Sequence, residues 1–241
     1  MGSPDHFKIK MQIVILCGGL GTRLTSVIGD TPKSLAPISD RTFIDYQLDF
    51  LNQFNDVSEV LLLTGYGSDV LEKYVKDNRY NFKLLFSKDS EERLGTFRAL
   101  REASYNQLLK NDFLLLFGDS IPNCDLPKIY TEFQKFEYQL GLTYISAKIV
   151  DELANIELKT DRVLYCSTAA TDNLEFVDYG VTYIKSDIFN HPISQQFSDL
   201  KKFIEFYTEN NYCIGFELFE PFLEIGTKES YEKAVVEFTH G

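Results

Sequence analysis

The stretch Ile13-Val-Ile-Leu-Cys-Gly-Gly-Leu-Gly-Thr-Arg-Leu24, which continues to Thr31-Pro-Lys-Ser-Leu-Ala-Pro37, decides the fold. Its first five residues form an apolar run typical of a buried strand, too short for a helix of ordinary length. Three glycines follow, and glycine permits positive φ and a close approach of a ligand to the main chain. The free N–H groups of such a loop form a concavity that binds anions, and Arg23 adds a permanent positive charge. The pattern therefore predicts a phosphate-binding loop rather than an ordinary tight turn.

Composition restricts the class of protein. The chain has 241 residues, 44% of them hydrophobic and 25% charged, which is ordinary for a globular protein that buries a sizeable core. No apolar run approaches the roughly 18 residues of a membrane helix, and no secretory signal is present. Four scattered cysteines (Cys17, Cys124, Cys166 and Cys213) form no C-x-x-C pair. We expect free thiols and a cytoplasmic location.

The formal net charge of −12 argues against nucleic acid or an anionic membrane as a partner, because both favour basic surfaces. A phosphate site in such a chain must gather its own cations locally. Residues 1–10 are polar and without pattern, so we interpret them as a disordered lead or a tag. Residues 11–241 show no linker or repeat and are expected to form a single domain.

The first half, residues 11–125, alternates strands and helices. Apolar runs at 57–63, 82–86 and 113–117 predict strands, and the spacing at 43–54 predicts an amphipathic helix. Thr96 is expected to cap a further helix that ends near Leu109. This order indicates a Rossmann-like, mainly parallel sheet with helices on both faces, in which ligands bind beyond the carboxyl ends of the strands.

The second half, residues 126–241, is expected to be mixed α/β. Residues 154–158 and 162–166, joined by a tight turn at 159–161, predict a small hairpin elaboration. The other expected strands are 140–147, 176–184 and 212–216, and the expected helices are 127–138, 199–207 and 228–238.

Several familiar motifs are excluded. The dinucleotide pattern G-x-G-x-x-G requires glycine where Leu24 stands, and no G-K-S/T triplet of a Walker loop occurs. A G-x-S-x-G elbow is missing, and His6, His191 and His240 lie outside any motif. Nucleophilic triads are therefore disfavoured.

What remains, Gly-Gly-Leu-Gly-Thr-Arg-Leu with Thr-Pro-Lys-Ser-Leu-Ala-Pro-Ile, resembles the sugar-1-phosphate nucleotidyltransferases, also called NDP-sugar pyrophosphorylases. Within this family, the chain is most similar to the D-glycero-D-manno-heptose 1-phosphate guanylyltransferase-like proteins. The resemblance extends over most of the chain from Met11 onward. It implies a nucleotide-diphospho-sugar transferase fold, with 11–125 as the nucleotide-binding half and 126–241 as the sugar-phosphate-binding half.

The resemblance also implies site residues. Arg23 and Lys33 would hold the triphosphate and the sugar phosphate as catalytic residues, while Asp119 and Glu224 would bind magnesium. The implied nucleotide-binding residues are Leu16, Gly18, Gly19, Gly21, Thr22, Arg23, Gly95, Thr96 and Gly118. Asp178, Tyr179 and Gly180 would line the sugar pocket, and Asn155 and Glu157 are further candidates for contacts with sugar hydroxyls.

These roles agree with the chemistry. Attack of a sugar-phosphate oxygen on the α-phosphorus of a triphosphate concentrates negative charge, and catalysis then depends on positioning and electrostatic stabilisation. One or two carboxylates together with phosphate oxygens are the usual ligands of Mg²⁺.

Two features depart from the family pattern. Relatives commonly carry small residues after Leu94-Gly95-Thr96, where this chain has Phe97 and Arg98. These side chains would reshape the pocket, add a cation near the phosphates, or lie on the outer face of the helix. Residues 165–170 contain no cation, although relatives often place a lysine there, which leaves the identity of the sugar open.

The function expected from the sequence is magnesium-dependent transfer of a nucleotidyl group from a nucleoside triphosphate, GTP before CTP, to a sugar 1-phosphate. Pyrophosphate would leave, and the NDP-sugar would serve glycan or polysaccharide synthesis. Two alternatives stay open: a non-catalytic nucleotide- or sugar-phosphate-binding module, and transfer to a non-sugar phosphate. Dimers are common in the family, so a homodimer is also an option.

Overall fold

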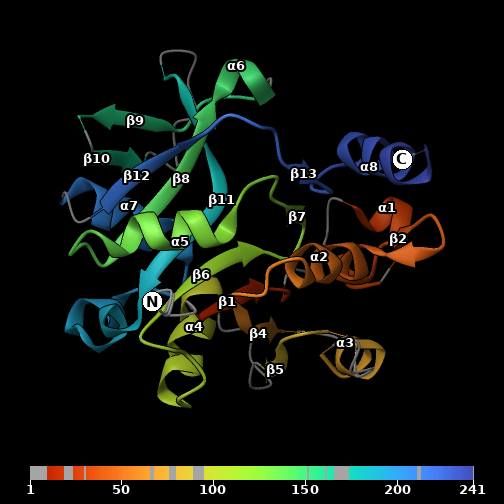
Figure 1. The fold of residues 1–241 in the computed structure, drawn as a ribbon, viewed down its shortest axis with the longest axis horizontal. Helices are drawn as coiled ribbons and strands as arrows, with labels where there is room; N and C mark the ends of the chain where they lie inside the picture. The colour runs from red at the N-terminus through yellow and green to blue at the C-terminus, as the bar shows by residue number, and fades with distance from the viewer. Residues whose placement is uncertain are drawn as a thin grey trace, which may run out of the picture.

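Figure 1 shows the fold in a computed structural model, which describes residues 10–18, 24–29, 31–65, 68–75, 80–88, 95–150, 152–160, 162–165, 174–210 and 213–240. Several residues singled out in the sequence lie outside these ranges: Gly19, Gly21, Thr22, Arg23, Leu94 and residues 166–170.

One large mixed sheet forms the centre of the described structure. In spatial order its strands are β5 (Lys83–Lys88), β4 (Val57–Thr64), β1 (Met11–Leu16), β6 (Asp112–Phe117), β11 (Phe176–Lys185), β8 (Leu140–Ser146), β12 (Cys213–Leu218), β10 (Arg162–Tyr165) and β9 (Ile156–Lys159). Two short two-stranded sheets accompany it: β2 (Pro37–Ile38) with β3 (Arg41–Thr42), and β7 (Ser120–Ile121) with β13 (Leu223–Glu224).

Strand β1 lies in the middle of the parallel half. It pairs in parallel with β4 and β6, so that Leu16 lies opposite both Leu63 and Phe117. Ile13, Val14 and Ile15 are fully buried, which explains why this strand is continuously apolar rather than alternating. The expected Rossmann-like arrangement is confirmed, and the carboxyl ends of β1 and β6 meet at one edge of the sheet.

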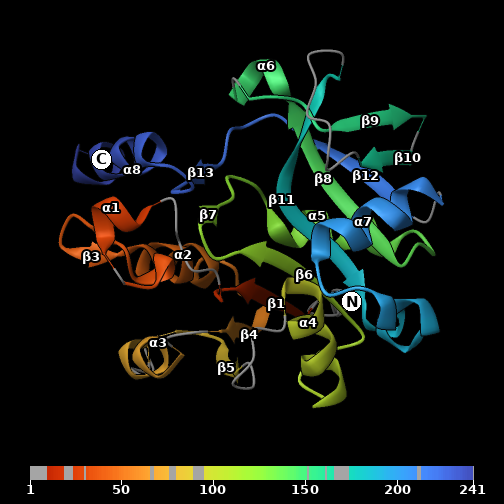
Figure 2. The ribbon, with the colours of Figure 1, turned by 180° about the vertical axis from the view of Figure 1, so that it is seen from behind.

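Helices cover both faces of this sheet (Figures 1 and 2). Apolar residues of α2 (Phe43–Asn52), α3 (Ser68–Val75) and α5 (Leu126–Gln134) pack in one core cluster. Residues of α4 (Thr96–Tyr105) and α7 (Leu200–Glu209) pack in a second cluster with the 3-10 turn η3 (Ser186–Asn190), which leads into η4 (Pro192–Gln196).

The second half adds antiparallel strands. Strand β11 is antiparallel to both β6 and β8, and β12 is parallel to β8. The predicted hairpin is confirmed, since β9 and β10 pair antiparallel around Thr160, which has φ of 59°. Strand β9 also pairs with β11, so the strands β11, β8, β12, β10 and β9 close on themselves.

The carboxyl end of the chain returns to its amino-terminal part. Both views show α8 (Lys228–His240) beside α1 (Thr25–Ile28) (Figures 1 and 2), and α8 also contacts β2, which Figure 1 labels. Leu24, Ile38, Phe43 and Ala234 share a third core cluster, and the hydroxyl of Tyr231 donates a hydrogen bond to the carbonyl oxygen of Pro37. This contact fixes the segment around the 3-10 turn η2 (Lys33–Leu35).

Two local expectations were wrong. Helix α4 begins at Thr96, with Gly95 at the N-cap position, and the Thr96 hydroxyl instead accepts a hydrogen bond from the Leu200 N–H. The same helix ends at Tyr105 rather than near Leu109, because Gln107 takes a positive φ of 57° that a right-handed helix does not allow. Among the described helices, which include the single turn α6 (Ala147–Val150), none is both long and apolar enough to cross a membrane.

Candidate active site

Lys33 and Asp119 form an ion pair at the carboxyl edge of the sheet. Lys33 opens η2 directly after Pro32, whose φ of −53° is fixed by its ring. The Lys33 side chain is only 12% exposed, and its Nζ lies 2.5 Å from Oδ2 of Asp119. A buried ammonium without a counter-charge is costly, so Asp119 is the group that holds this lysine in the site.

Asp119 lies in the turn between β6 and β7. Its predecessor Gly118 donates its N–H to the carbonyl oxygen of Leu16, at 3.0 Å, and so joins the ends of β1 and β6. A Cβ atom on Gly118 would lie 2.6 Å from that oxygen, closer than real Cβ contacts. Glycine is therefore required here by space, and the Asp119 carboxylate is positioned beside the strand that leads to the glycine loop.

The first residues after β1 lie within reach of Asp119. Burial, and secondarily the Asp119 carboxylate, raises the pKa of the Cys17 thiol to about 12. This thiol therefore stays protonated at neutral pH. A Cβ atom on Gly18 would lie 3.0 Å from the backbone nitrogen of Gly65, so the start of the loop packs closely against the end of β4.

Glu224 is brought to the same turn by the pairing of β7 with β13. Glu224 lies opposite Ser120, and the N–H of Ile225 donates to the carbonyl oxygen of Asp119 at 2.9 Å. The two predicted metal ligands, separated by 105 residues in sequence, are thus on directly hydrogen-bonded segments. Only the tertiary fold makes them neighbours.

A third carboxylate, Glu152, was not anticipated from the sequence. Loss of solvent around its carboxyl group, followed by repulsion from the Glu224 carboxylate, raises the pKa of Glu152. Glu152 follows α6 without any recognisable motif, so no sequence signal could have revealed this proximity. Negative charge is concentrated on this side of the site.

The donor chemistry fits a magnesium ion. Mg²⁺ takes oxygen ligands and is usually held by one or two carboxylates plus substrate phosphates. Asp119 and Glu224 offer such oxygens, and Lys33 already shows that a cation is stabilised at Asp119. In the described part of the chain, no three His, Cys, Asp or Glu side chains converge in a way that could hold a metal. Phosphate oxygens of the substrates would have to complete the coordination.

The predicted sugar-side residues Asn155, Asp178 and Gly180 lie together. The Oδ1 atom of Asn155 accepts the N–H of Asp178, and Oδ1 of Asp178 accepts the N–H of Gly180, each at 3.0 Å. Gly180 has φ of 88°, and a Cβ atom there would lie 3.2 Å from the Phe117 ring. Because Phe117 ends β6, this group adjoins the Asp119 turn.

The protonation of Asp178 is unusual. Burial raises the pKa of its carboxyl group to about 6, although the Gly180 N–H and the Lys201 ammonium act in the opposite direction. Lys201, which lies in the first turn of α7, was not anticipated from the sequence. The Lys201 ammonium is thus a positive charge near Asp178, although residues 165–170 contain no cation.

The remaining predicted residues occupy less central positions. Tyr179 is buried, and its hydroxyl accepts the N–H of Asn123 at 2.8 Å, so its side chain belongs to the core rather than to an open pocket wall. Glu157 is exposed on β9. Gly95 and Thr96 are exposed next to the start of α7, where a Cβ atom on Gly95 would lie 2.6 Å from the Ser198 carbonyl oxygen.

Phe97 has a structural role. Its side chain is fully buried and stacks on Phe203 with ring centroids 3.8 Å apart, and it also contacts Phe189 and Phe197. The position on the outer face of the helix, considered from the sequence, is therefore wrong for Phe97, because its side chain points into the core between α4 and α7. Arg98, the next residue, is only partly buried.

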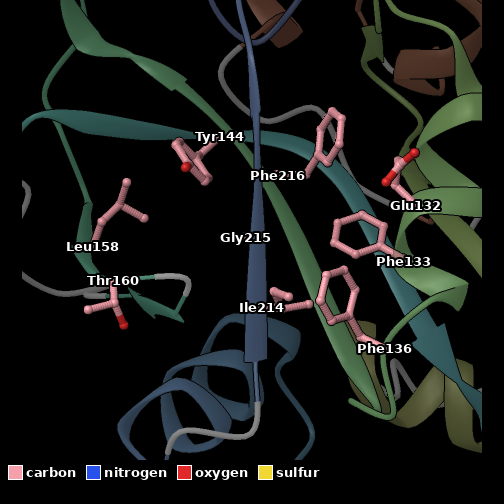
Figure 3. Close-up of a pocket in the computed structure, with 9 residues that line it drawn as sticks. All are labelled: Glu132, Phe133, Phe136, Tyr144, Leu158, Thr160, Ile214, Gly215 and Phe216. Carbon is pink, nitrogen blue, oxygen red and sulfur yellow. The ribbon is translucent and has the colours of Figure 1, made fainter.

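A groove of about 290 Å³ lies elsewhere, alongside the middle of β12 (Figure 3). Phe133, Phe136 and Phe216 line one side of it, and Tyr144 and Leu158 line the other. It contains none of the predicted site residues, so we do not identify it with the active site.

A Rossmann-like sheet that carries a lysine–carboxylate pair and further carboxylates at its carboxyl edge has charged groups where ligands bind in this class of α/β proteins. Residues 12–154 match the family model described as nucleotidyl transferase. The chain belongs to this nucleotidyl transferase family.

Three similar proteins make the relationship more specific. D-glycero-alpha-D-manno-heptose 1-phosphate guanylyltransferase from Campylobacter jejuni is 31% identical over 92% of this chain and 97% of that protein. The protein of the same name from Aneurinibacillus thermoaerophilus is 28% identical over 95% of this chain and 99% of its own length. The crystal structure of HddC from Yersinia pseudotuberculosis has a TM-score of 0.73 at 24% identity, covering 95% of this chain and 99% of that one.

A second HddC structure, complexed with GMP-PN, has a TM-score of 0.65 at 25% identity, covering 95% of this chain and 99% of that one. The predicted fold and the resemblance to sugar-1-phosphate nucleotidyltransferases are therefore confirmed.

Proposed function

We propose that this enzyme transfers a guanylyl group from GTP to a sugar 1-phosphate in a magnesium-dependent reaction, and that a heptose 1-phosphate is its acceptor. The observation that carries the proposal is the Lys33–Asp119 ion pair, which places a lysine beside a carboxylate at the sheet edge, where the proposed phosphate and metal ion would bind. Two relatives named heptose 1-phosphate guanylyltransferases and the HddC complex with GMP-PN support the choice of base and sugar.

The residues divide the reaction between them. An oxygen of the sugar phosphate attacks the α-phosphorus, the bond from that phosphorus to the bridging oxygen breaks, and pyrophosphate leaves with the electron pair. Arg23 and Lys33 hold the phosphates, and Asn155, Asp178 and Gly180 orient the sugar. Bound magnesium, held by Asp119 and Glu224, would neutralise charge that develops on the phosphate oxygens. Lys33 would contact the phosphates in place of Asp119.

No protein nucleophile is required in this scheme. Cys17, whose thiol feels the charge of the Asp119 carboxylate, is protonated at neutral pH, and the chemistry depends on positioning and charge. The product is a GDP-sugar, which a glycan-building reaction would consume.

The direct test is a pyrophosphate-release assay with magnesium, the four common nucleoside triphosphates and a panel of phosphate acceptors. The panel contains the heptose 1-phosphate, several hexose 1-phosphates, and a phosphorylated alditol and amine. We expect the fastest release with GTP and the heptose 1-phosphate. Faster pyrophosphate release with CTP or with a non-sugar acceptor would support nucleotidyl transfer but contradict the proposed substrates. No release with any pair would favour a non-catalytic binding module.

A further inference from the structure

Gln47, in the middle of α2, is buried directly behind the turn that carries Asp119. Its side chain is 0% exposed. The Nε2 atom donates to the carbonyl oxygen of Phe117 at 2.8 Å and to that of Ser120 at 2.7 Å. One amide group therefore bridges the last residue of β6 and the first residue of β7, with only Gly118 and Asp119 between them.

The chemistry of this contact is specific to a primary amide. The two N–H bonds of one nitrogen can reach two carbonyl oxygens, whereas a glutamate at neutral pH has acceptors only and a methionine has no donor. The amide orientation follows from its surroundings, because the reverse orientation would place Oε1 against both carbonyl oxygens.

The arrangement has an energetic cost that points to a function. The Oε1 atom of Gln47 is buried and has no hydrogen-bond partner in the part of the chain that the structure describes. A buried polar group left without a hydrogen-bond partner destabilises the folded state. An apolar helix residue would avoid that cost, yet it would leave the carbonyl oxygens of Phe117 and Ser120 without this donor.

We propose that Gln47 is a positioning residue of the transfer site, which fixes the Gly118–Asp119 turn and thereby the Asp119 carboxylate that binds the metal. Other contacts fix the same turn: the Gly118 N–H donates to Leu16, and the Asp119 carbonyl oxygen accepts from Ile225. Gln47 ties this turn to α2 through hydrogen bonds to Phe117 and Ser120. The part of the inference that concerns metal rests on the proposed function.

Gln12 provides a matched control. It is also a buried glutamine, 1% exposed, and its Nε2 donates to the carbonyl oxygen of Leu108 at 2.8 Å while its Oε1 accepts the N–H of Lys110 at 2.9 Å. It lies near the start of β1, at the end of the sheet away from Asp119. Gln47→Met and Gln12→Met thus each remove a hydrogen-bonded side-chain amide from a buried position. Only Gln47 lies next to the turn that carries Asp119.

The first measurement requires neither metal nor substrate. Hydrogen–deuterium exchange is followed over residues 117–121 of the wild type and both variants. We expect at least about tenfold faster exchange of the Gly118 amide in Gln47→Met, and wild-type exchange there in Gln12→Met. Unchanged exchange in Gln47→Met, or an equal increase in both variants, would overturn the proposal.

The second measurement is Mn²⁺ binding by electron paramagnetic resonance to the protein saturated with GTP and without acceptor, so that phosphate oxygens can complete the coordination. Loss of a group that orients a metal ligand typically weakens metal binding by about 10- to 100-fold, so we expect this for Gln47→Met alone. Equal affinity in the wild type and Gln47→Met would refute the positioning role. No Mn²⁺ binding by the wild type would instead refute the metal part of the proposed function, and the exchange data would still decide whether Gln47 fixes the turn.

If Gln47→Met does not fold, Gln47→Asn takes its place. Asparagine keeps both donors but is one methylene shorter, so we expect exchange and Mn²⁺ affinity to change in the same directions by a smaller factor. Wild-type values for both measurements in folded Gln47→Asn would count against the proposal.

Discussion

The Nζ atom of Lys33 lies 2.5 Å from the Oδ2 atom of Asp119, although the two residues are 86 positions apart in sequence. Lys33 is 12% exposed and Asp119 33%, so the pair is shielded from water more than a surface ion pair. Each group compensates the charge of the other. In the proposed reaction both side chains change partners. The Lys33 ammonium binds a phosphate, and the Asp119 carboxylate binds a metal ion.

Replacement of Lys33 tests the first of these roles. We expect Lys33→Ala to lower kcat by about 100- to 1,000-fold, as loss of one preorganised electrostatic contact does in other enzymes, while the protein remains folded. Steady-state pyrophosphate release and thermal unfolding are the measurements. Lys228→Ala removes a lysine from an exposed pair with Glu232 and serves as the control, with kcat expected to be unchanged. Near-normal turnover by Lys33→Ala would show that the lysine has been assigned wrongly.

Glu224 is expected to act through the metal. Gln at this position keeps the size of the side chain and removes its charge, so Glu224→Gln should raise the magnesium concentration for half-maximal rate at least about tenfold. The same change removes a negative neighbour of Glu152, so the pKa of Glu152 should fall. Magnesium titration of the rate measures the first effect, and carboxyl-carbon NMR across pH measures the second. An unchanged magnesium requirement would exclude Glu224 as a ligand.

Long apolar and amphipathic segments were predictable from the sequence. The apolar run at 113–117 correctly predicted strand β6, and the apolar spacing at 43–54 correctly predicted helix α2. Both predictions rest on the periodicity of hydrophobic residues along the chain. The hairpin around Thr160 was predictable too, since its turn residues are local signals. The catalytic and metal-binding roles of Lys33, Asp119 and Glu224 come from the resemblance to a family, and these roles stay predictions.

Features that depend on distant contacts could not be predicted. Strands β7 and β13 have two residues each, too few for any period to show, and yet they bring Glu224 to Asp119. Thr96 has the residue type of a cap, but its hydroxyl accepts the N–H of Leu200, 104 positions away. Phe97 is buried because Phe203 from α7 stacks on it, and no pattern within α4 contains that information.

Gly118 allows a test of the turn itself. A methyl group there would meet the backbone of Leu16 and Cys17, which cannot move without separating β1 from β6. We expect Gly118→Ala to lower the free energy of unfolding by about 1–3 kcal/mol and to reduce kcat as well. Gly141→Ala is the matched control, because its Cβ atom would lie 2.5 Å from the Phe133 ring, away from the site. That variant should lose stability but keep kcat when folded, as urea unfolding and the rate assay would show.

The raised pKa of Asp178 predicts that the stability of the protein depends on pH. Its folded-state pKa of about 6 lies above the ordinary value of 3.8, so the folded protein holds this proton more tightly than the unfolded chain. The stabilisation is complete below about pH 4 and is lost as the pH rises through about 6. Asp178→Asn keeps an Oδ1 acceptor for the Gly180 N–H and cannot ionise. At pH 7 we therefore expect this variant to be more stable than the wild type by about 2–3 kcal/mol, a difference that disappears toward pH 4.

Urea unfolding of both proteins from pH 4 to pH 8 measures this difference directly, because titrations common to both cancel. Glu209→Gln, which removes an exposed carboxylate at the end of α7, controls for the loss of one negative charge. If the two stability curves of the wild type and Asp178→Asn run parallel between pH 4.5 and pH 7, Asp178 is not held in its neutral form by the fold.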